Sequence, residues 1–571
     1  MIKHILSFII IATATSVVWS QQRSEQEMLD IARKQLSTHT SSAKRIKGSG
    51  EGEVKAILTR DAFSMYAREG AGFVIVSSES RMSPILAYGS DIPDPQNLPC
   101  GMQWWMEEME TQTQKLKESK LFASASSQTY IPVENILAAQ WGQEKPYNRL
   151  CPEISGKQPP TGCVATAMAQ ILYFYRYPAA GKGTGRYSLG NETAKMSAEI
   201  SSTYAWDLMV DKYKRTTASE ESQNAVATLM RDCGYGCYMN YSLEGSGSYI
   251  NDCTRSFIDN FSYNPASIRI YYRDYFSNDE WMQMIQDELM ANRPILYAGS
   301  DKDHGGHAFI FSGIREDGLV YVNWGWDGSA DGYYDIRSLN PTGILGTSYP
   351  YAFIEQQQMV VGIKAEPGSG DGESEETFIA MDAPFTAKAI GNSYIQCVCD
   401  VVYNIGYRVF VGEIGFFFVS DDGDVDKNVF FATFDNRSSG TPFTVNSGER
   451  LRTKLVSVSS IVPGEYHLYM AARPTQSDHL EIMRTVGGIY SIPVSKSADG
   501  TVSFEDGYIV DAISPITISL GEERSESISR VYDATGRLVY SAPSSHFNPW
   551  NVPAHGILVV KEGNKVRKIV R

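Results

Sequence analysis

The sequence has no surplus of basic residues. Its 51 lysines and arginines stand against 66 aspartates and glutamates, which gives a formal net charge of -15. A protein that binds nucleic acid or an anionic membrane surface needs positive charge to neutralise phosphates, so both kinds of partner are disfavoured. After residue 20 the sequence also has no apolar run near the ~20 residues that a membrane-spanning helix requires. We therefore expect no nucleic-acid partner and no membrane-spanning segment.

Several motifs of hydrolases and metal sites are also missing. The chain contains neither Gly-x-Ser-x-Gly nor His-Glu-x-x-His, which disfavours a serine hydrolase of the nucleophile-elbow type and a zinc peptidase. Its eight cysteines are too sparse for a disulfide scaffold, and no two of them form a Cys-x-x-Cys pair. The spacing of Cys233 and Cys237 is weak evidence for zinc. We expect no metal ion and no organic cofactor.

The first residues have the pattern of a signal peptide. Lys3 precedes an apolar run over residues 5–18, and small residues follow up to Ser20. The run is short for crossing a bilayer, and the pattern favours a cleaved export signal over a buried N-terminal helix. We predict that residues 1–20 are the signal peptide of an exported protein.

The rest of the chain is too long for one hydrophobic core, since single cores stop growing near ~250–300 residues. A Ser- and Ala-rich stretch at 119–128 is typical of a site where chains are cleaved. A Gly-, Glu- and Ser-rich stretch indicates a flexible linker, and the spaced strands beyond it indicate a β-sandwich. We predict an α+β protein built from a pro-domain (21–127), a central domain (128–364), a linker (365–376), a β-sandwich (377–515) and a small all-β C-terminal domain (516–571).

Cys163 stands in an unusual setting within the central domain. Two prolines and Gly162 end the loop before it, and small residues with an apolar face follow, so we expect the cysteine in the first turn of a buried helix. There the helix dipole and the free N–H groups stabilise a thiolate and lower its pKa. The same N–H groups can receive an oxyanion. Taken alone, the pattern fits a nucleophile and a structural cysteine about equally well.

The central domain contains only two histidines, His304 and His307. His307 follows two glycines, which let a peptide backbone approach closely, and it opens an apolar strand. A hairpin returns this strand towards Asn323 and Trp324, and the loop length decides which of the two shares the face of His307. Either could fix the imidazole, Asn323 through a hydrogen bond and Trp324 as a shield. A metal site formed by the two histidines is disfavoured, because no third ligand is near.

Four segments of the central domain carry a resemblance to a known family. They are Gln143-Glu144-Lys145-Pro146-Tyr147-Asn148, Gly162-Cys163-Val164-Ala165-Thr166-Ala167, Gly305-Gly306-His307-Ala308-Phe309 and Val322-Asn323-Trp324-Gly325-Trp326. In this order they resemble the streptopain family of papain-like cysteine peptidases. The resemblance implies a papain-like fold, in which a helical subdomain carries the cysteine and a β subdomain carries the histidine.

The resemblance also implies roles for individual residues. Cys163 is expected to be the nucleophile and His307 the general base. Gln143 is expected to donate its side-chain amide to the oxyanion, beside the N–H of Cys163, and Gln140 is the less favoured alternative. Asn323 and Trp324 are expected to orient the imidazole.

Three further positions follow from the same resemblance. Gly306 and the loop around Gly245-Ser246-Gly247 are expected to line the substrate cleft, with Ser246 as a binding residue. Asp327 departs from the family pattern, which usually has glycine there. We expect this change to alter a loop rather than the chemistry.

The flanking regions extend the resemblance. Segments 72–78 and 83–88 are similar to the inhibitory pro-domain of the family, and segments 531–537 and 556–560 resemble the sorting domain of the type IX secretion pathway of Bacteroidetes. They imply a zymogen that crosses the periplasm of a Gram-negative bacterium to the outside or the cell surface. Its own pro-domain would be its inhibitor, the secretion machinery would be a partner, and we expect cleavage between Lys115 and Gln128.

Taken together, these features predict a secreted cysteine endopeptidase that hydrolyses proteins through a thioester on Cys163. One alternative is a thiol amidase or acyl transferase that uses the same Cys163–His307 pair on cell-wall peptides. The other is a surface-binding protein with an inert peptidase-like domain. The presence of Gln143 and Asn323 beside the pair argues against the inert protein.

Overall fold

The computed structural model describes residues 22–38, 52–118, 129–190, 194–213, 218–265, 267–301, 305–336, 357–366, 379–405, 410–420, 432–433, 443–445, 449–450, 454–475, 479–510, 517–519, 528–533, 538–543, 557–562 and 565–570. The predicted signal peptide, the predicted cleavage stretch 119–128, His304 and most of the predicted linker lie outside these residues. The chain divides into two compact units, Met1–Ser477 with Glu481–Ile516, and Asp478–Leu480 with Thr517–Arg571.

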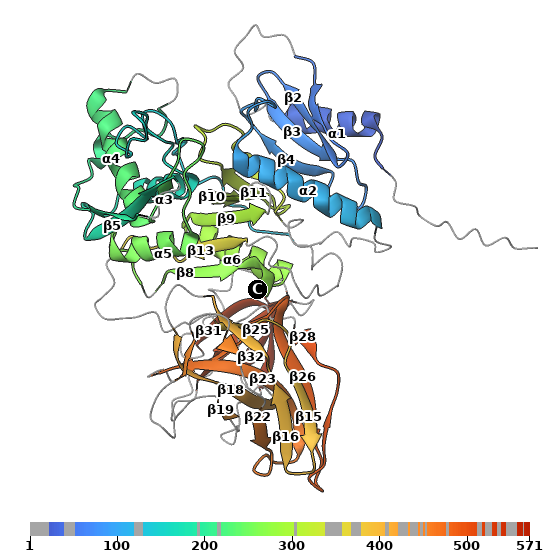
Figure 1. The fold of residues 1–571 in the computed structure, drawn as a ribbon. Coiled ribbons are helices and arrows are strands. Elements are labelled where there is room, and N and C mark those ends of the chain that lie inside the picture. The colour runs from blue at the N-terminus through green and yellow to red at the C-terminus, as the bar shows by residue number, and fades with distance from the viewer. Residues whose placement is uncertain are drawn as a thin grey trace, which may run out of the picture. The chain divides into compact units, whose positions relative to one another are not determined.

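The pro-domain is an antiparallel meander between two helices: α1 (Glu25–Thr38), β1 (Lys55–Thr59), β2 (Phe63–Arg68), β3 (Gly72–Ser77), β4 (Ile85–Gly89) and α2 (Cys100–Glu118). Helix α1 begins where Ser24 and Glu27 exchange hydrogen bonds between side chain and backbone, which satisfies N–H groups of its first turn. Because side chains alternate along a strand, Val74 faces α1 while Phe73 faces α2. Figure 1 shows the two helices on opposite faces of these strands.

The central domain begins mainly with helices and ends with strands. Its elements are α3 (Cys163–Tyr175), β5 (Thr184–Leu189), β6 (Met196–Glu199), η2 (Trp206–Leu208), α4 (Glu220–Gly236), β7 (Asn240–Tyr241), α5 (Ile250–Asp259), β8 (Arg269–Tyr272), η3 (Arg273–Tyr275), α6 (Asn278–Met290), β9 (Ile295–Asp301), β10 (Gly305–Ile314), β11 (Val320–Asn323), β12 (Gly332–Tyr334) and β13 (Gln358–Val361). Helix α3 is almost entirely buried, and it shares one hydrophobic core with α4, α5 and one face of β9 and β10. The predicted order of a helical part and a β part is confirmed.

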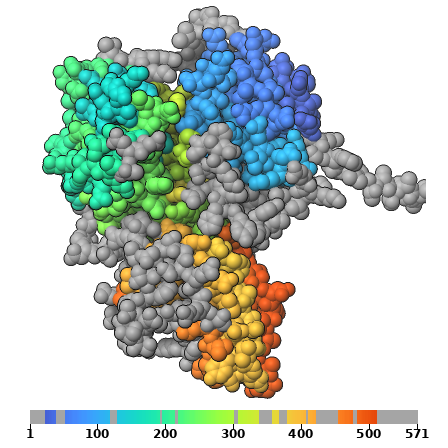
Figure 2. All heavy atoms as spheres, in the orientation of Figure 1, coloured from blue at the N-terminus to red at the C-terminus, as the bar shows by residue number. Residues whose placement is uncertain are grey.

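The strands of the central domain continue the sheet of the pro-domain. Ten strands lie in the order β1-β2-β3-β4-β12-β11-β10-β9-β13-β8. At the junction β12 pairs with β4 in antiparallel register, with Tyr333 opposite Tyr88. Figure 2 shows the blue atoms of the pro-domain packed directly against the yellow-green atoms of the later strands. The pro-domain is therefore held by backbone hydrogen bonds as well as by side chains, a feature that no local sequence pattern indicates.

The region after the linker is built from strands in its described residues: β14 (Ile379–Met381), β15 (Thr386–Ile390), β16 (Tyr394–Val398), β17 (Val401–Asn404), β18 (Phe410–Ser420), β19 (Ala432–Thr433), β20 (Phe443–Val445), β21 (Glu449–Arg450), β22 (Lys454–Ser457), β23 (Gly464–Pro474), β24 (His479–Ile482), β25 (Arg484–Thr485), β26 (Gly488–Lys496), β27 (Val502–Phe504) and β28 (Tyr508–Val510). Strands β15, β16 and β22 form one sheet, and β18, β23 and β26 belong to another. Ile395 of the first sheet and Phe416 of the second lie in one buried core.

The C-terminal strands are β29 (Thr517–Ser519), β30 (Ile528–Asp533), β31 (Leu538–Pro543), β32 (Ile557–Glu562) and β33 (Lys565–Val570). Four of them form an antiparallel sheet in the order β31-β30-β32-β33. Helices and strands are both present in the chain, so the predicted α+β class is confirmed.

Candidate active site

Cys163 is the first residue of helix α3, as predicted. Gly162 before it has φ +87°, a left-handed value that favours glycine. A Cβ at this position would lie 2.6 Å from Cε of Met239 and 3.0 Å from the carbonyl oxygen of Ser246. The backbone N–H of Thr166 donates to the Gly162 carbonyl at 3.0 Å, which closes the first turn of the helix. The loop and the helix thus hold the thiol at one fixed point.

The thiol of Cys163 lies where the helix meets strand β10. The backbone N–H groups of Ala308, of Val164 and of Cys163 itself are directed at the sulfur and favour a thiolate. Desolvation by the surrounding protein outweighs them, and burial raises the pKa of the Cys163 thiol above its ordinary value. The predicted lowering of this pKa is therefore wrong for the chain with its pro-domain in place, although the N–H groups act in the predicted direction.

His307 lies on the same strand, directly before Ala308, whose N–H is aimed at the sulfur. Strand β10 pairs with β9 on one side, where His307 stands opposite Gly299, and with β11 on the other. The sulfur of Cys163, at the start of α3, thus lies against the backbone of the residue that follows His307 on β10. This junction is the basis of a Cys–His site.

The register of β10 and β11 decides which hairpin residue shares the face of His307. Ile310 pairs with Asn323, and an irregularity in the ladder lies between Phe311 and Gly313. Since side chains alternate, Asn323 falls on the Ile310 face, and His307 falls on the face of Phe309. The rings of Phe309 and Trp324 lie 4.8 Å apart, so Trp324 is on the side of His307.

Asn323 consequently forms its hydrogen bonds away from the imidazole. Its amide exchanges two hydrogen bonds of 3.1 Å with the amide of Gln170 on α3, and it also donates to the Ala139 carbonyl at 2.8 Å. Its oxygen accepts from the Gly325 N–H at 3.0 Å. The geometry therefore corrects the expectation of a direct bond to His307, because the strand register turns Asn323 towards the nucleophile helix.

Gln143 lies on a segment that is bonded to the loop before Cys163. Its carbonyl accepts a hydrogen bond of 3.0 Å from the N–H of Thr161, two residues before the cysteine. Gln140 is placed differently, because its side chain fills the space next to Gly328, where a Cβ would come within 2.7 Å of it. Of the two candidates, Gln143 is the one attached to the nucleophile loop.

The residues predicted to line the cleft lie on both sides of this loop. Ser246 donates its hydroxyl to the Pro160 carbonyl at 2.7 Å, so the 245–247 loop borders the segment before Cys163. Gly306 is exposed and pairs with Ser300 of β9, next to His307. Ser246 is thus close to the site, with its hydroxyl engaged in holding the loop.

The start of helix α2 in the pro-domain lies against the site. The indole N–H of Trp326 donates to the sulfur of Cys100, and burial together with the nearby thiol of Cys163 raises the pKa of Cys100 to about 12. At Gly101 a Cβ would come within 2.6 Å of the Trp324 ring. No local sequence pattern indicates this contact, because the pro-domain and the Trp324 loop are distant in the chain.

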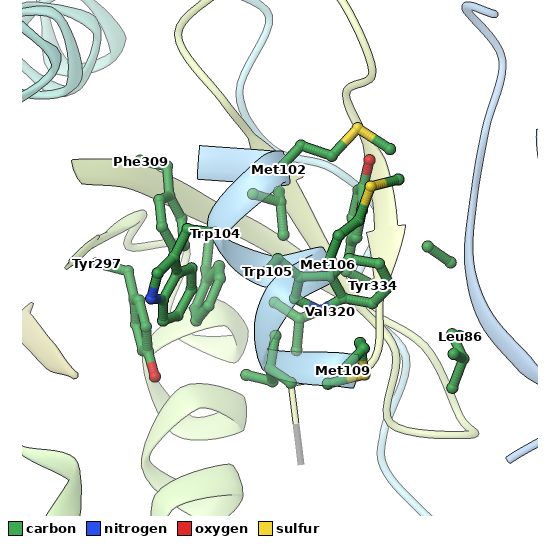
Figure 3. Close-up of a cluster of buried hydrophobic side chains, with 14 of the residues drawn as sticks. Leu86, Met102, Trp104, Trp105, Met106, Met109, Tyr297, Phe309, Val320 and Tyr334 are labelled. Atoms are coloured by element: carbon green, nitrogen blue, oxygen red, sulfur yellow. The ribbon is translucent and has the colours of Figure 1, made fainter. Parts of the chain in front are cut away.

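The rest of α2 packs along the same face of the sheet. Trp105 donates its indole N–H to the Asp335 carbonyl at 2.9 Å and meets the Tyr334 ring edge-on at 5.0 Å. Trp104 lies 6.0 Å from Phe309. Figure 3 shows these rings interleaved with methionines of the helix. The pro-domain therefore shares one hydrophobic core with the strands that carry His307 and Trp324.

Asp331 is a buried carboxyl group under the Trp324 loop that no sequence pattern indicated. Asp331 accepts the backbone N–H of Trp324 at 3.0 Å. Burial raises its pKa from the ordinary range to about 7. Its position after a turn gave no signal in the sequence, since the burial arises from the packing of β12 against β4.

Within the described residues, no group of three or more His, Cys, Asp or Glu side chains could hold a metal ion. No helix in the same part of the chain is long and apolar enough to span a membrane.

Comparison with known proteins gives two family matches. Residues 141–334 match the model of the peptidase C10 family, and residues 20–113 match that of the Spi protease inhibitor. Both matches fall on the segments described above, the first on the Cys163 and His307 elements and the second on the pro-domain.

Among curated proteins, streptopain of Streptococcus pyogenes is 31% identical over 324 residues, which are 52% of this chain and 80% of that protein. The thiol protease/hemagglutinin PrtT of Porphyromonas gingivalis is 28% identical over 367 residues, 61% of this chain, and only 41% of its own length is spanned. A solved structure of a prointerpain A fragment from Prevotella intermedia is 30% identical, with a TM-score of 0.49, over 55% of this chain and 100% of that one.

Proposed function

The chain belongs to the peptidase C10 family, and on this premise we propose that it hydrolyses proteins as a cysteine endopeptidase made in a latent form. The observation that carries the proposal is the Ala308 N–H directed at the sulfur of Cys163, which sets the nucleophile beside the His307 strand. The comparisons give no support to an amidase of cell-wall peptides or to an inert binding protein.

The reaction follows from the roles proposed for these residues. His307 takes the proton of the Cys163 thiol, and the sulfur attacks the carbonyl carbon of the substrate. The backbone N–H of Cys163 and the side-chain amide of Gln143 donate to the oxyanion, each worth about 3–4 kcal/mol in the transition state. His307 then protonates the leaving amine, and water resolves the thioester.

Trp324 and Asn323 have separate parts in this scheme. The part proposed for Trp324 is to shield the imidazole of His307 from water, and the contact of its ring with Phe309 on the same strand supports this. Asn323 fixes the distance between α3 and β11 through its amide pair with Gln170. It acts on the geometry of Cys163 rather than directly on the histidine.

Substitution of the nucleophile tests the proposal. Cys163→Ala, freed of its pro-domain, is expected to lose casein hydrolysis by several orders of magnitude. Cys397→Ala, which removes a buried thiol from the strands after the linker, serves as the control and should keep full activity. Equal rates for the Cys163→Ala protein and the unmodified enzyme would overturn the assignment.

Latency is proposed to come from the pro-domain. Its strand β4 extends the catalytic sheet, and the start of α2 lies on Trp324 and near Cys163. Activation then requires cleavage and separation of these contacts. N-terminal sequencing of the active form should give a start between Lys115 and Gln128, and a start far from this window would contradict the proposal.

Export is proposed from the two ends of the sequence. The pattern over residues 1–20 supports a signal peptide, and the resemblance of 516–571 to a sorting domain supports type IX secretion through the periplasm of a Gram-negative bacterium. Removal of 516–571 in a host with this pathway should retain the protein in the periplasm. Unchanged release of the shortened chain would refute the sorting role.

A further inference from the structure

Asp327 has a backbone conformation that glycine adopts more easily. Its φ is +54°, in the left-handed region, where residues other than glycine pay a steric cost and where Asp and Asn are the best tolerated. A glycine at this position would avoid that cost. The aspartate must therefore contribute something that glycine lacks, and its contacts show what this is.

The side chain and backbone of Asp327 both bind one segment of the central domain, residues 141–147. The hydroxyl of Tyr147 donates to Oδ1 of Asp327 at 2.8 Å, and the backbone N–H of Asp327 donates to the Trp141 carbonyl at 3.1 Å. The carboxylate also lies close against Gly142, where a Cβ would come within 2.6 Å of Oδ2. Three contacts from one residue thus hold both ends of the segment.

The hydrogen bond between Tyr147 and Asp327 lies in a protected setting. The Tyr147 side chain is fully buried, and its ring packs edge-on against Tyr213 at 5.5 Å. A hydrogen bond to a carboxylate is stronger than one between neutral groups, and water competes with it little in such surroundings. Burial, and next the nearby Asp327 carboxylate, raise the pKa of Tyr147, so the phenol remains a donor.

Gln143 lies between the two ends that Asp327 holds. Its carbonyl accepts from the Thr161 N–H at 3.0 Å, which ties the same segment to the loop before Cys163. A third tie comes from the nucleophile helix, where Gln170 accepts the backbone N–H of Trp141 at 3.1 Å. The segment is therefore fixed on both sides, to the Trp324 loop by Asp327, to α3 by Gln170 and to the loop before Cys163 by Thr161.

We propose that Asp327 is a positioning residue, which holds the 141–147 segment so that the Gln143 amide meets the oxyanion formed at Cys163. This inference rests on the proposed peptidase function and adds a residue to it. Loss of Asp327 would leave substrate binding intact and would weaken only an interaction made in the transition state. Its effect therefore belongs in kcat rather than in KM.

The test compares steady-state kinetics of processed variants on a peptide substrate. Asp327→Gly should lower kcat by about tenfold to a hundredfold and leave KM within about twofold, since a misplaced oxyanion donor costs part of its full contribution. Asp327→Asn keeps an accepting oxygen and tolerates the left-handed backbone, so it should retain most of the rate. Tyr147→Phe should lose as much as Asp327→Gly, and the double variant no more than either one.

Measurements in the Gln143→Ala enzyme distinguish positioning of the Gln143 amide from a general loss of rigidity. In Gln143→Ala enzyme, Asp327→Gly should cause no further loss, because the group that it positions is gone. Asn292→Gly is the matched control, since Asn292 also has a left-handed φ of +57° but lies on the turn before β9, and its rate should be unchanged.

Each result has a distinct meaning. Unchanged kcat in Asp327→Gly and Tyr147→Phe, or a full further loss in the Gln143→Ala background, would overturn the positioning role while the peptidase assignment stood. An unmodified processed chain that hydrolyses no peptide would instead remove the proposed function itself. Thermal unfolding of each variant checks that it is folded.

Discussion

Gly101→Ala should weaken the contact between helix α2 of the pro-domain and the Trp324 ring at the active site. The new Cβ would lie 2.6 and 2.8 Å from two carbons of the Trp324 ring and 3.5 Å from Phe309. Carbon atoms in contact prefer about 3.5–4.0 Å, so the ring or the helix must move by about 1 Å. Overpacking of this kind costs about 1–3 kcal/mol, which raises the population of the open state by about 5- to 150-fold.

The rate at which iodoacetamide labels Cys163 in the uncleaved chain measures that population, and the label also prevents self-cleavage. Gly101→Ala should be labelled faster by the stated factor. Gly52→Ala is the matched control in the same domain, because its Cβ would meet only ordinary contacts, the nearest at 3.6 Å from Glu69. If Gly101→Ala is folded and is labelled at the rate of Gly52→Ala, the start of α2 does not restrain the site.

Three further outcomes follow from the site. Burial raises the pKa of Asp331 to about 7, so the folded chain holds a proton that the unfolded chain releases near pH 4, and the free energy of unfolding falls as the pH rises between these values. In urea unfolding, the free energy of unfolding of Asp331→Asn relative to the unmodified chain should therefore increase by roughly 4 kcal/mol from about pH 4 to about pH 8. Parallel curves for the two proteins would refute this. Gln170→Ala should lower the free energy of unfolding by about 2–5 kcal/mol, because the Trp141 N–H loses its partner and Asn323 loses two hydrogen bonds; a loss under about 1 kcal/mol would show that water replaces them. Gly162→Ala should abolish hydrolysis, since its φ of +87° and the Met239 contact leave no room for a methyl group, and an active enzyme would contradict the fixed geometry of the loop.

The sequence was a good guide where the signal is local. Two prolines and a glycine before small residues predicted the start of a helix at Cys163, and α3 begins there. The glycine pair and apolar run predicted the strand of His307. Such features depend on neighbouring residues alone, so the sequence contains all that is needed.

Long-range features could not be obtained in this way. The choice between Asn323 and Trp324 depended on an irregularity in the ladder between Phe311 and Gly313, which changes the alternation of faces. The direction in which the Cys163 pKa is shifted depended on burial, which tertiary packing produces. In both cases tertiary packing decided the outcome.

The pairing of β4 with β12 within the ten-stranded sheet is a third example. Strand β4 of the pro-domain and strand β12 of the central domain each look like ordinary strands in the sequence. Their pairing places Gly332 so close to the Tyr88 carbonyl, 2.3 Å from where a Cβ would be, that only glycine fits. A lone glycine beside a strand does not identify its partner, so this contact became evident only in the structure.

The pH dependence of Cys163 alkylation, before and after removal of the pro-domain, tests the central claim most directly. In the processed chain, a thiolate paired with the His307 imidazolium should react half-maximally well below the ordinary thiol pKa of about 8.5. The uncleaved chain should react only at higher pH, because burial raises the pKa of its thiol, and His307→Ala should abolish the low-pH reaction of the processed form. A single profile shared by all three proteins would contradict a Cys163–His307 pair.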